Sequence, residues 1–232
     1  MNEKIFIERL DAAVMGHSML SHPFYQAWNA GKLDRAILQE YVKQYFAHVK
    51  AFPTYVSGVH SQMDDLEMRK LLLENLIEEE QGEENHPELW LRFAEGLGVS
   101  REDVLGADLL EKTKESVATF RSLTREKGAT EGLAALYAYE SQIPEVAKTK
   151  RAGLKEFYSL DDDRSVSFFT VHEEADVIHS AIERRFLAEQ DTDSQEVAIE
   201  AADKASAALW NFLDGVYEAY VPETVKEEMM AC

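Results

Sequence analysis

Apolar residues recur every three or four positions along most of the chain. The segment 34–63 shows this spacing in four residues: Ile37, Tyr41, Tyr45 and His48. A step of three or four residues is typical of one face of an α-helix. No window alternates strictly between apolar and polar residues, so we expect no β-sheet. The pattern therefore predicts an all-α protein.

Turn residues divide this pattern into about seven long helices and a short one. The expected long helices cover about residues 2–20, 34–63, 65–97, 107–126, 130–158, 161–189 and 194–220. Ser100 with Asp103 three positions later predicts the short helix, and Pro53 is expected to kink its helix without ending it. No linker rich in Pro, Gly or Ser appears. We therefore expect a single domain over residues 1–232, a bundle of about seven helices around a central cavity.

Acidic residues outnumber basic ones, with 44 Asp and Glu against 24 Lys and Arg, which gives a formal net charge of −20. A surface this acidic repels nucleic acid and anionic membranes, so we expect neither as a partner. The N-terminus does not resemble a signal peptide, and no stretch approaches ~18 consecutive apolar residues. We therefore expect a cytoplasmic protein. The single cysteine, Cys232, excludes an intramolecular disulfide bond.

The clearest candidate site lies in the expected helix 161–189. His172, Asp176 and His179 follow one another at i, i+4 and i+7, which places all three on one helix face. Two imidazoles and a carboxylate in register suit iron, manganese or zinc. The alternative is a solvated helix face that carries these histidines by chance.

Further candidate ligands occur in two other segments. Glu79 and Glu83 both share a helix face with His86, and the spacing alone does not choose between them. The alternative is that these glutamates belong to a solvated acidic helix. Glu140 follows an apolar run, so its carboxylate is either buried and metal-bound or exposed on a helix surface. Together the three segments offer three histidines and three acidic ligands, enough for two metal ions.

Tyrosines are the other notable feature of the expected inner faces. The residues concerned are Tyr25, Tyr41, Tyr45, Tyr137 and Tyr139. As amphipathic core residues with bonded hydroxyls they would need no catalytic role. Lys148 and Lys150 follow Pro144 and are most simply surface charges. The chain has no GxGxxG, Walker A or G-x-S-x-G motif, which argues against the nucleotide-binding and hydrolase classes that use them.

Five longer motifs carry a resemblance to a known family. They are HPFYQAW (22–28), HVKAFPTYVSGVH (48–60), EEEQGEENHPELWLRFAEGLG (78–98), ESQIPEVAKTK (140–150) and FFTVHEEADVIHSAIE (168–183). Over about residues 5–220 the chain resembles the family of the Chlamydia protein associating with death domains. That family belongs to the haem-oxygenase-like dinuclear oxygenases and is similar in fold to pyrroloquinoline-quinone synthase C and thiaminase II. The resemblance implies a haem-oxygenase-like bundle and, from the fold family, a homodimer.

The resemblance also implies a metal site and a reaction. The metal ligands of the family match Glu79, His86, Glu140, His172, Asp176 and His179, so Glu79 is preferred over Glu83. The implied cofactors are two transition-metal ions, iron or iron with manganese, together with molecular oxygen and an external reductant whose electron donor is unknown.

The family is implicated in making para-aminobenzoate for folate synthesis from a tyrosine of the protein itself. That residue matches Tyr25, with Tyr41 as its redox partner, and the amino group comes from a lysine that matches Lys150. One position departs from the family pattern, because a tyrosine of the chlamydial protein corresponds to Phe168 here. A radical that passes through that phenol in the relative must take another route in this chain.

Two other functions remain open at this point. A cofactor-independent oxidase similar to pyrroloquinoline-quinone synthase C would need a cationic pocket for an acidic substrate. A non-enzymatic interaction protein would need an exposed apolar patch.

Overall fold

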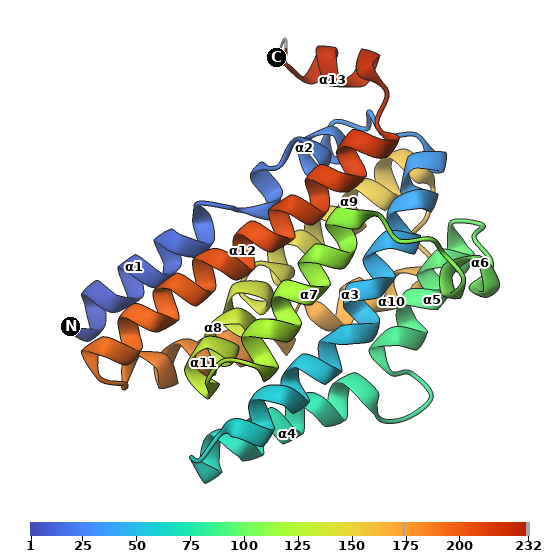
Figure 1. Ribbon diagram of the computed structural model, residues 1–232. Helices are drawn as coiled ribbons and strands as arrows, with labels where there is room; N and C mark the ends of the chain where they lie inside the picture. Colours follow the sequence, from blue (N-terminus) through green and yellow to red (C-terminus); the bar gives the residue numbers. More distant parts are fainter. Residues whose placement is uncertain (174, 231–232) are drawn as a thin grey trace.

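The computed structural model describes residues 1–173 and 175–230. Within these residues it has thirteen α-helices, one short 3₁₀ helix and no β-strand, so the expected all-α class is confirmed (Figure 1). In chain order the elements are α1 (Glu3–Met15), η1 (Met19–Ser21), α2 (Pro23–Asn29), α3 (Arg35–Gln62), α4 (Leu66–Glu80), α5 (His86–Gly96), α6 (Arg101–Leu105), α7 (Glu111–Arg125), α8 (Ala129–Glu140), α9 (Ile143–Tyr158), α10 (Asp163–His172), α11 (Ala175–Ala188), α12 (Thr192–Tyr220) and α13 (Glu223–Met230). Cys232 lies outside the described residues.

The helices outnumber the seven long ones expected, because several expected helices are divided in two. Pro87 and Pro144 lie in the first turns of α5 and α9, where the missing N–H of proline leaves no hydrogen bond unmade. Pro53, in contrast, lies inside α3, which continues through it as expected. The short helix predicted at Ser100 is also confirmed, since the Ser100 hydroxyl accepts a hydrogen bond from the backbone N–H of Asp103 at the start of α6.

The single helix expected over 161–189 is wrong. Helix α10 ends at His172 and α11 begins at Ala175. Glu173, directly after α10, forms an ion pair with Arg151 of α9 at 2.7 Å. This pair ties the end of α10 to α9 at the point where the chain changes direction.

Two long helices organise the bundle. Helix α12 packs against α1, α7 and α8, and α3 packs against α4, α7 and α8 (Figure 1). Helix α10 packs against α5 and α9, which closes the side of the bundle beside α3. Helix α13 lies beyond the end of α12, outside the main bundle (Figure 1). None of the described helices is long and apolar enough to span a membrane.

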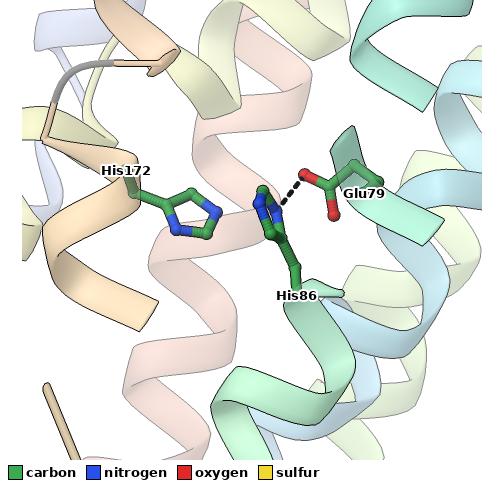
Figure 2. A group of neighbouring side chains, drawn as sticks. All are labelled: Glu79, His86 and His172. Carbon is green, nitrogen blue, oxygen red and sulfur yellow. Dashed lines mark ion pairs between the residues drawn. The ribbon is translucent and has the colours of Figure 1, made fainter. Parts of the chain in front are cut away.

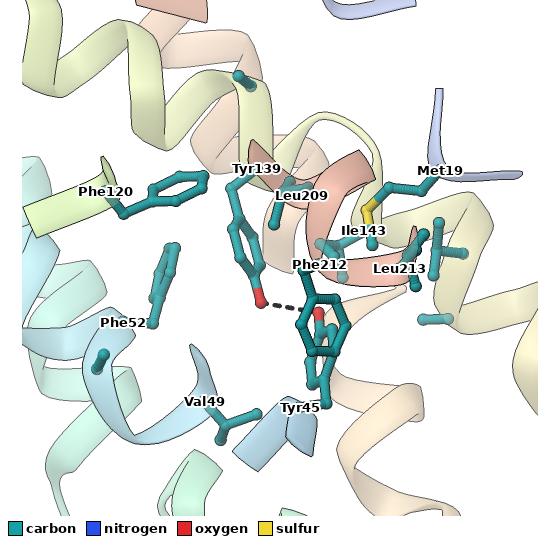
Figure 3. Packing of buried hydrophobic residues seen from close by; sticks show 14 of the residues in the cluster. Met19, Tyr45, Val49, Phe52, Phe120, Tyr139, Ile143, Leu209, Phe212 and Leu213 are labelled. Atoms are coloured by element: carbon teal, nitrogen blue, oxygen red, sulfur yellow. Dashed lines mark hydrogen bonds between the residues drawn. The ribbon is translucent and has the colours of Figure 1, made fainter. Parts of the chain in front are cut away.

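Aromatic side chains fill the interior between these helices. Tyr45 and Tyr139 meet at its centre, between Phe120 and Phe52 on one side and Phe212 on the other (Figure 3). Full burial of an aromatic side chain stabilises the fold by about 1.5–3 kcal/mol relative to leaving it exposed. A substantial part of the stability of the fold therefore comes from this aromatic interior.

Candidate metal centre

The first group of candidate ligands consists of Glu79, His86 and His172, which come from the ends of α4, α5 and α10 (Figure 2). Oε1 of Glu79 lies 2.8 Å from Nδ1 of His86, and the rings of His86 and His172 are 4.3 Å apart between centroids. All three side chains are buried. One ligand atom from each residue lies within 4.8 Å of the others, so a single ion could contact all three.

His172 is held in the form that binds a metal. Its Nδ1 lies 2.6 Å from the carbonyl oxygen of Phe168, one turn earlier in α10. A carbonyl oxygen only accepts, so Nδ1 carries the proton and Nε2 keeps its lone pair. Burial, reinforced by the nearby His86, holds the pKa of His172 well below its usual value. The imidazole is therefore neutral, as a metal ligand must be.

The second group consists of Glu140, Asp176 and His179, at the end of α8 and the start of α11. Nδ1 of His179 lies 3.5 Å from Oε1 of Glu140 and 4.0 Å from Oδ1 of Asp176. The side-chain amide of Asn75 donates a hydrogen bond of 2.8 Å to Oε1 of Glu140. Within the described part of the chain, Oε2 of Glu140 and Nδ1 of His179 are buried without a hydrogen-bond partner.

Both groups face one small internal cavity. Five of the candidate ligands line it: Glu79, His86, Glu140, His172 and Asp176. Its volume is about 20 Å³, which leaves room for roughly one water-sized molecule. No Lys or Arg contributes to this lining among the described residues.

The electrostatics of the cavity favour a bound cation. Burial raises the pKa of Glu79 and, to a larger extent, that of Asp176, whose carboxyl is also repelled by Glu140 and Glu79. Buried carboxylates and orphaned ligand atoms are costly unless a proton or a metal ion compensates them. Carboxylate and imidazole ligands together suit iron and manganese. The residues present thus fit a pair of transition-metal ions.

A chain of hydrogen bonds joins two phenols and an amine near this cavity. The hydroxyl oxygens of Tyr25 and Tyr41 are 2.8 Å apart, and Nζ of Lys150 donates to the Tyr41 oxygen at 2.7 Å. All three side chains are buried. Burial lowers the pKa of Lys150 well below its usual value and raises the pKa values of Tyr25 and Tyr41 well above theirs. Both phenols are therefore uncharged near neutral pH, and burial favours the uncharged form of the amine.

A second phenol pair lies between that chain and the cavity. The hydroxyl of Tyr139 donates to that of Tyr45 at 2.7 Å, and both residues line the cavity (Figure 3). The Tyr45 ring centroid is 5.5 Å from that of Tyr41. Tyr45 therefore connects the candidate ligands to Tyr41 by direct packing.

The sequence model of the TENA/THI-4/PQQC family matches residues 11–219. The chain belongs to this family. It is 44% identical over 213 residues to the 4-aminobenzoate synthase of Chlamydia muridarum, covering 92% of this chain and 90% of that protein. It is 41% identical over 242 residues to the 4-aminobenzoate synthase of Nitrosomonas europaea, covering 100% and 98%. The pyrroloquinoline-quinone synthase of Acidiphilium cryptum is 25% identical over 208 residues, covering 86% and 83%. The family resemblance expected from the five motifs is thus confirmed.

Solved structures of family members and their neighbours share the fold. A TenA homologue from Pseudomonas syringae superimposes with a TM-score of 0.77 at 17% identity, covering 93% of this chain and 92% of that one. A domain with a haem oxygenase-like fold from Shewanella denitrificans superimposes with a TM-score of 0.71 at 20% identity, covering 94% and 91%. The expected haem-oxygenase-like fold is therefore confirmed for this TENA/THI-4/PQQC family member.

The structure divides the expected helical triad between the two groups. His172 ends α10, whereas Asp176 and His179 belong to α11, so the three residues do not share one helix face. They nevertheless remain neighbours, because His172 and Asp176 line the same cavity. The six candidate ligands come from five helices rather than three.

Two predictions about individual side chains are settled by burial. Glu83 lies in the exposed loop after α4, whereas Glu79 is buried beside His86, so only Glu79 reaches the candidate centre. The interpretation of Lys150 as a surface charge is wrong, since its side chain is buried. That interpretation holds for Lys148, which is exposed.

Sequence reasoning missed one acidic residue, Glu183. It lies on α11 one turn after His179 and is 2% exposed. Its position seven residues after Asp176 was a signal that could have found it, because both then share a face of α11.

Proposed function

We propose that this protein is an oxygen-dependent enzyme with a dinuclear metal centre that makes 4-aminobenzoate (para-aminobenzoate) for folate synthesis from its own Tyr25. The observation that carries the proposal is the buried Tyr25–Tyr41–Lys150 hydrogen-bond chain beside a cavity lined by carboxylates and imidazoles. Relatives that are 41–44% identical and named 4-aminobenzoate synthase support the product assignment.

Six residues would hold the two ions, iron or iron with manganese: Glu79, His86, Glu140, His172, Asp176 and His179. When bound, the metals would supply the oxidising power by activating molecular oxygen with electrons from an external reductant. The surrounding aromatic core excludes water, which protects a reactive oxidant from side reactions.

Tyr41 is placed to relay a proton between the other two members of the chain. Nζ of Lys150 contacts the Tyr41 oxygen, and either of the Tyr25 and Tyr41 hydroxyls can donate to the other. A phenol loses its proton when it is oxidised, and that proton would reach Lys150 when Tyr25 donates to Tyr41 and Tyr41 donates to the lone pair of an unprotonated Nζ. Before it takes up that proton, unprotonated Lys150 is a nucleophile.

Tyr45 would carry electrons between Tyr41 and the metals. Phe168 lines the cavity with its ring centroid 4.2 Å from that of His172, but it has no hydroxyl to oxidise. Tyr45 and Tyr139 are the phenols that line the cavity among the described residues. Tyr45 also packs against Tyr41, so it supplies the alternative route that the change to Phe168 requires.

The cavity volume argues for a substrate that belongs to the protein. About 20 Å³ holds one molecule the size of water or oxygen, and no free aromatic compound. A cofactor-independent oxidase acting on an acidic substrate would need a cationic pocket. The ionisable groups in the described lining of this cavity are carboxylates, imidazoles and two phenols, with no Lys or Arg among them.

The test is a single-turnover reaction of the metal-loaded protein with oxygen and a reductant. Intact-mass measurement should show a loss of mass at Tyr25 in step with the 4-aminobenzoate formed, with about one product per chain. Tyr25→Phe should fold and bind metal but give no product, because an unhydroxylated ring is far harder to oxidise. Repeated turnover with an unmodified Tyr25 would instead identify a conventional enzyme acting on a free substrate.

The proposal also predicts a growth phenotype. A bacterium that lacks its ordinary para-aminobenzoate synthase should grow without that nutrient when it expresses this protein. Failure to rescue growth, with the protein folded and metal-loaded, would remove the folate assignment.

A further inference from the structure

Glu183 is a buried carboxylate that lies beside another buried carboxylate, Glu140. Its side chain is 2% exposed, and within the described part of the chain neither carboxylate oxygen has a hydrogen-bond partner. A buried carboxylate in this state is unfavourable unless it is protonated or meets a cation.

A groove beside Glu183 leaves space for a cation next to its carboxylate. A groove of about 190 Å³ between α4 and α11 reaches His179 and Glu183 from the surface. Its other polar residues are Glu74, Asn75 and Glu78, and no Lys or Arg lines it among the described residues. Nδ1 of His179, buried and without a hydrogen-bond partner, is one turn away on the same helix.

We propose that Glu183 is a seventh ligand of the metal centre and binds the second ion together with Glu140, Asp176 and His179. This inference rests on the metal centre of the proposed function and extends it. The groove then provides the entry path that a buried metal site needs, with the Glu78 carboxylate at its rim 3.4 Å from Nε2 of His179.

Charge balance independently favours a fourth carboxylate. Glu79, Glu140 and Asp176 supply three negative charges, whereas two divalent ions carry four positive ones. Adding Glu183 makes the buried centre neutral, and an uncompensated charge in a low-dielectric interior is expensive. Four carboxylates are also the number found in the dinuclear centres of ferritin-like helical bundles.

The test is anaerobic titration of the metal-free full chain with Mn²⁺, with free Mn²⁺ measured by electron paramagnetic resonance. Wild type should bind two ions per chain. Glu183→Gln, which keeps the shape of the side chain and removes its charge, should bind one ion as wild type does and the second at least about tenfold more weakly. Glu74→Gln removes an exposed carboxylate from the same groove and should bind two ions with unchanged affinity.

The outcomes separate this inference from the proposed function. Two ions bound equally well by wild type and by Glu183→Gln would overturn the role of Glu183 and leave the dinuclear centre standing. No binding by wild type would remove the metal centre itself. A matching loss in Glu74→Gln would also overturn the proposal, because it would reduce the effect to the general negative charge of the groove. Circular dichroism of each metal-free variant checks that it is folded.

Discussion

Lys150 provides the sharpest test of the buried chain, because its charge state can be read from stability. The side chain is 2% exposed, and burial lowers its pKa well below the usual value of 10.5. In the unfolded chain the amine is protonated up to about pH 10.5, whereas in the folded chain it loses its proton at a lower pH. The unfolded state therefore binds one more proton between the two pKa values, and folding becomes more favourable as the pH rises through that window.

The magnitude follows directly from this difference of one proton. Each pH unit inside the window should add about 1.4 kcal/mol to the free energy of unfolding of wild type relative to Lys150→Met. Methionine is a suitable replacement because it is similar in length and apolar. The substitution loses the 2.7 Å hydrogen bond to Tyr41, which is worth about 1 kcal/mol. It also removes the penalty for burying an amine.

The assay is urea unfolding of the metal-free protein at a series of pH values from neutral upward. The difference between wild type and Lys150→Met should grow with pH, since the other titrating groups are common to both proteins. Lys148→Met, at an exposed position on the same helix, controls for the loss of a lysine as such. Parallel pH profiles for wild type and Lys150→Met would refute the assignment of a neutral amine and, with it, the role of Lys150 as nucleophile.

Three further predictions concern the metal centre, the phenols and the packing around them. Glu79→Ala should sharply reduce metal occupancy, measured by elemental analysis, whereas Glu83→Ala in the exposed loop should leave it unchanged. Tyr45→Phe should fold but slow product formation in a single turnover more than Tyr139→Phe does. Both phenols line the cavity, but Tyr45 is the one of the two whose ring packs against Tyr41. Equal rates for the two variants would contradict electron transfer through Tyr45. Gly153→Ala should destabilise the fold by about 1–3 kcal/mol in urea unfolding. The reason is that a Cβ at position 153 would lie 2.6 Å from the indole nitrogen of Trp28 in α2.

The sequence predicted the class of the fold from periodicity, but not the ends of its helices. Five of the six candidate ligands lie at or next to a helix end: Glu79, His86, Glu140, His172 and Asp176. Helical spacing shows which residues share a face within one continuous helix. It does not show how two helices are oriented relative to each other across a break. The triad of His172, Asp176 and His179 was therefore placed on one face, although the chain turns between α10 and α11.

Burial was the second property that local sequence could not supply. Lys148 and Lys150 have the same chemistry and lie on the same helix, yet only Lys150 turns inward. What decides this is the packing of α9 against α10 and α2, and the contact with α2 joins segments more than a hundred residues apart. Glu183 was missed for the same reason, since its spacing from Asp176 places both on one helix face but does not show that this face is buried.

The packing around Tyr25 also gives a physical reason why each chain would react only once under the proposed function. Folding places the phenol beside Tyr41 and Lys150 in advance, so the entropic cost of bringing reactants together is met once, when the chain folds. Tyr25 is fully buried against Phe24 and Trp28. Losing its ring would leave a cavity comparable to that of an aromatic-to-alanine change, which costs about 3–5 kcal/mol. A net stability of about 5–15 kcal/mol is typical of a domain, so the reaction that releases the product would also remove a large part of the stability of the spent chain.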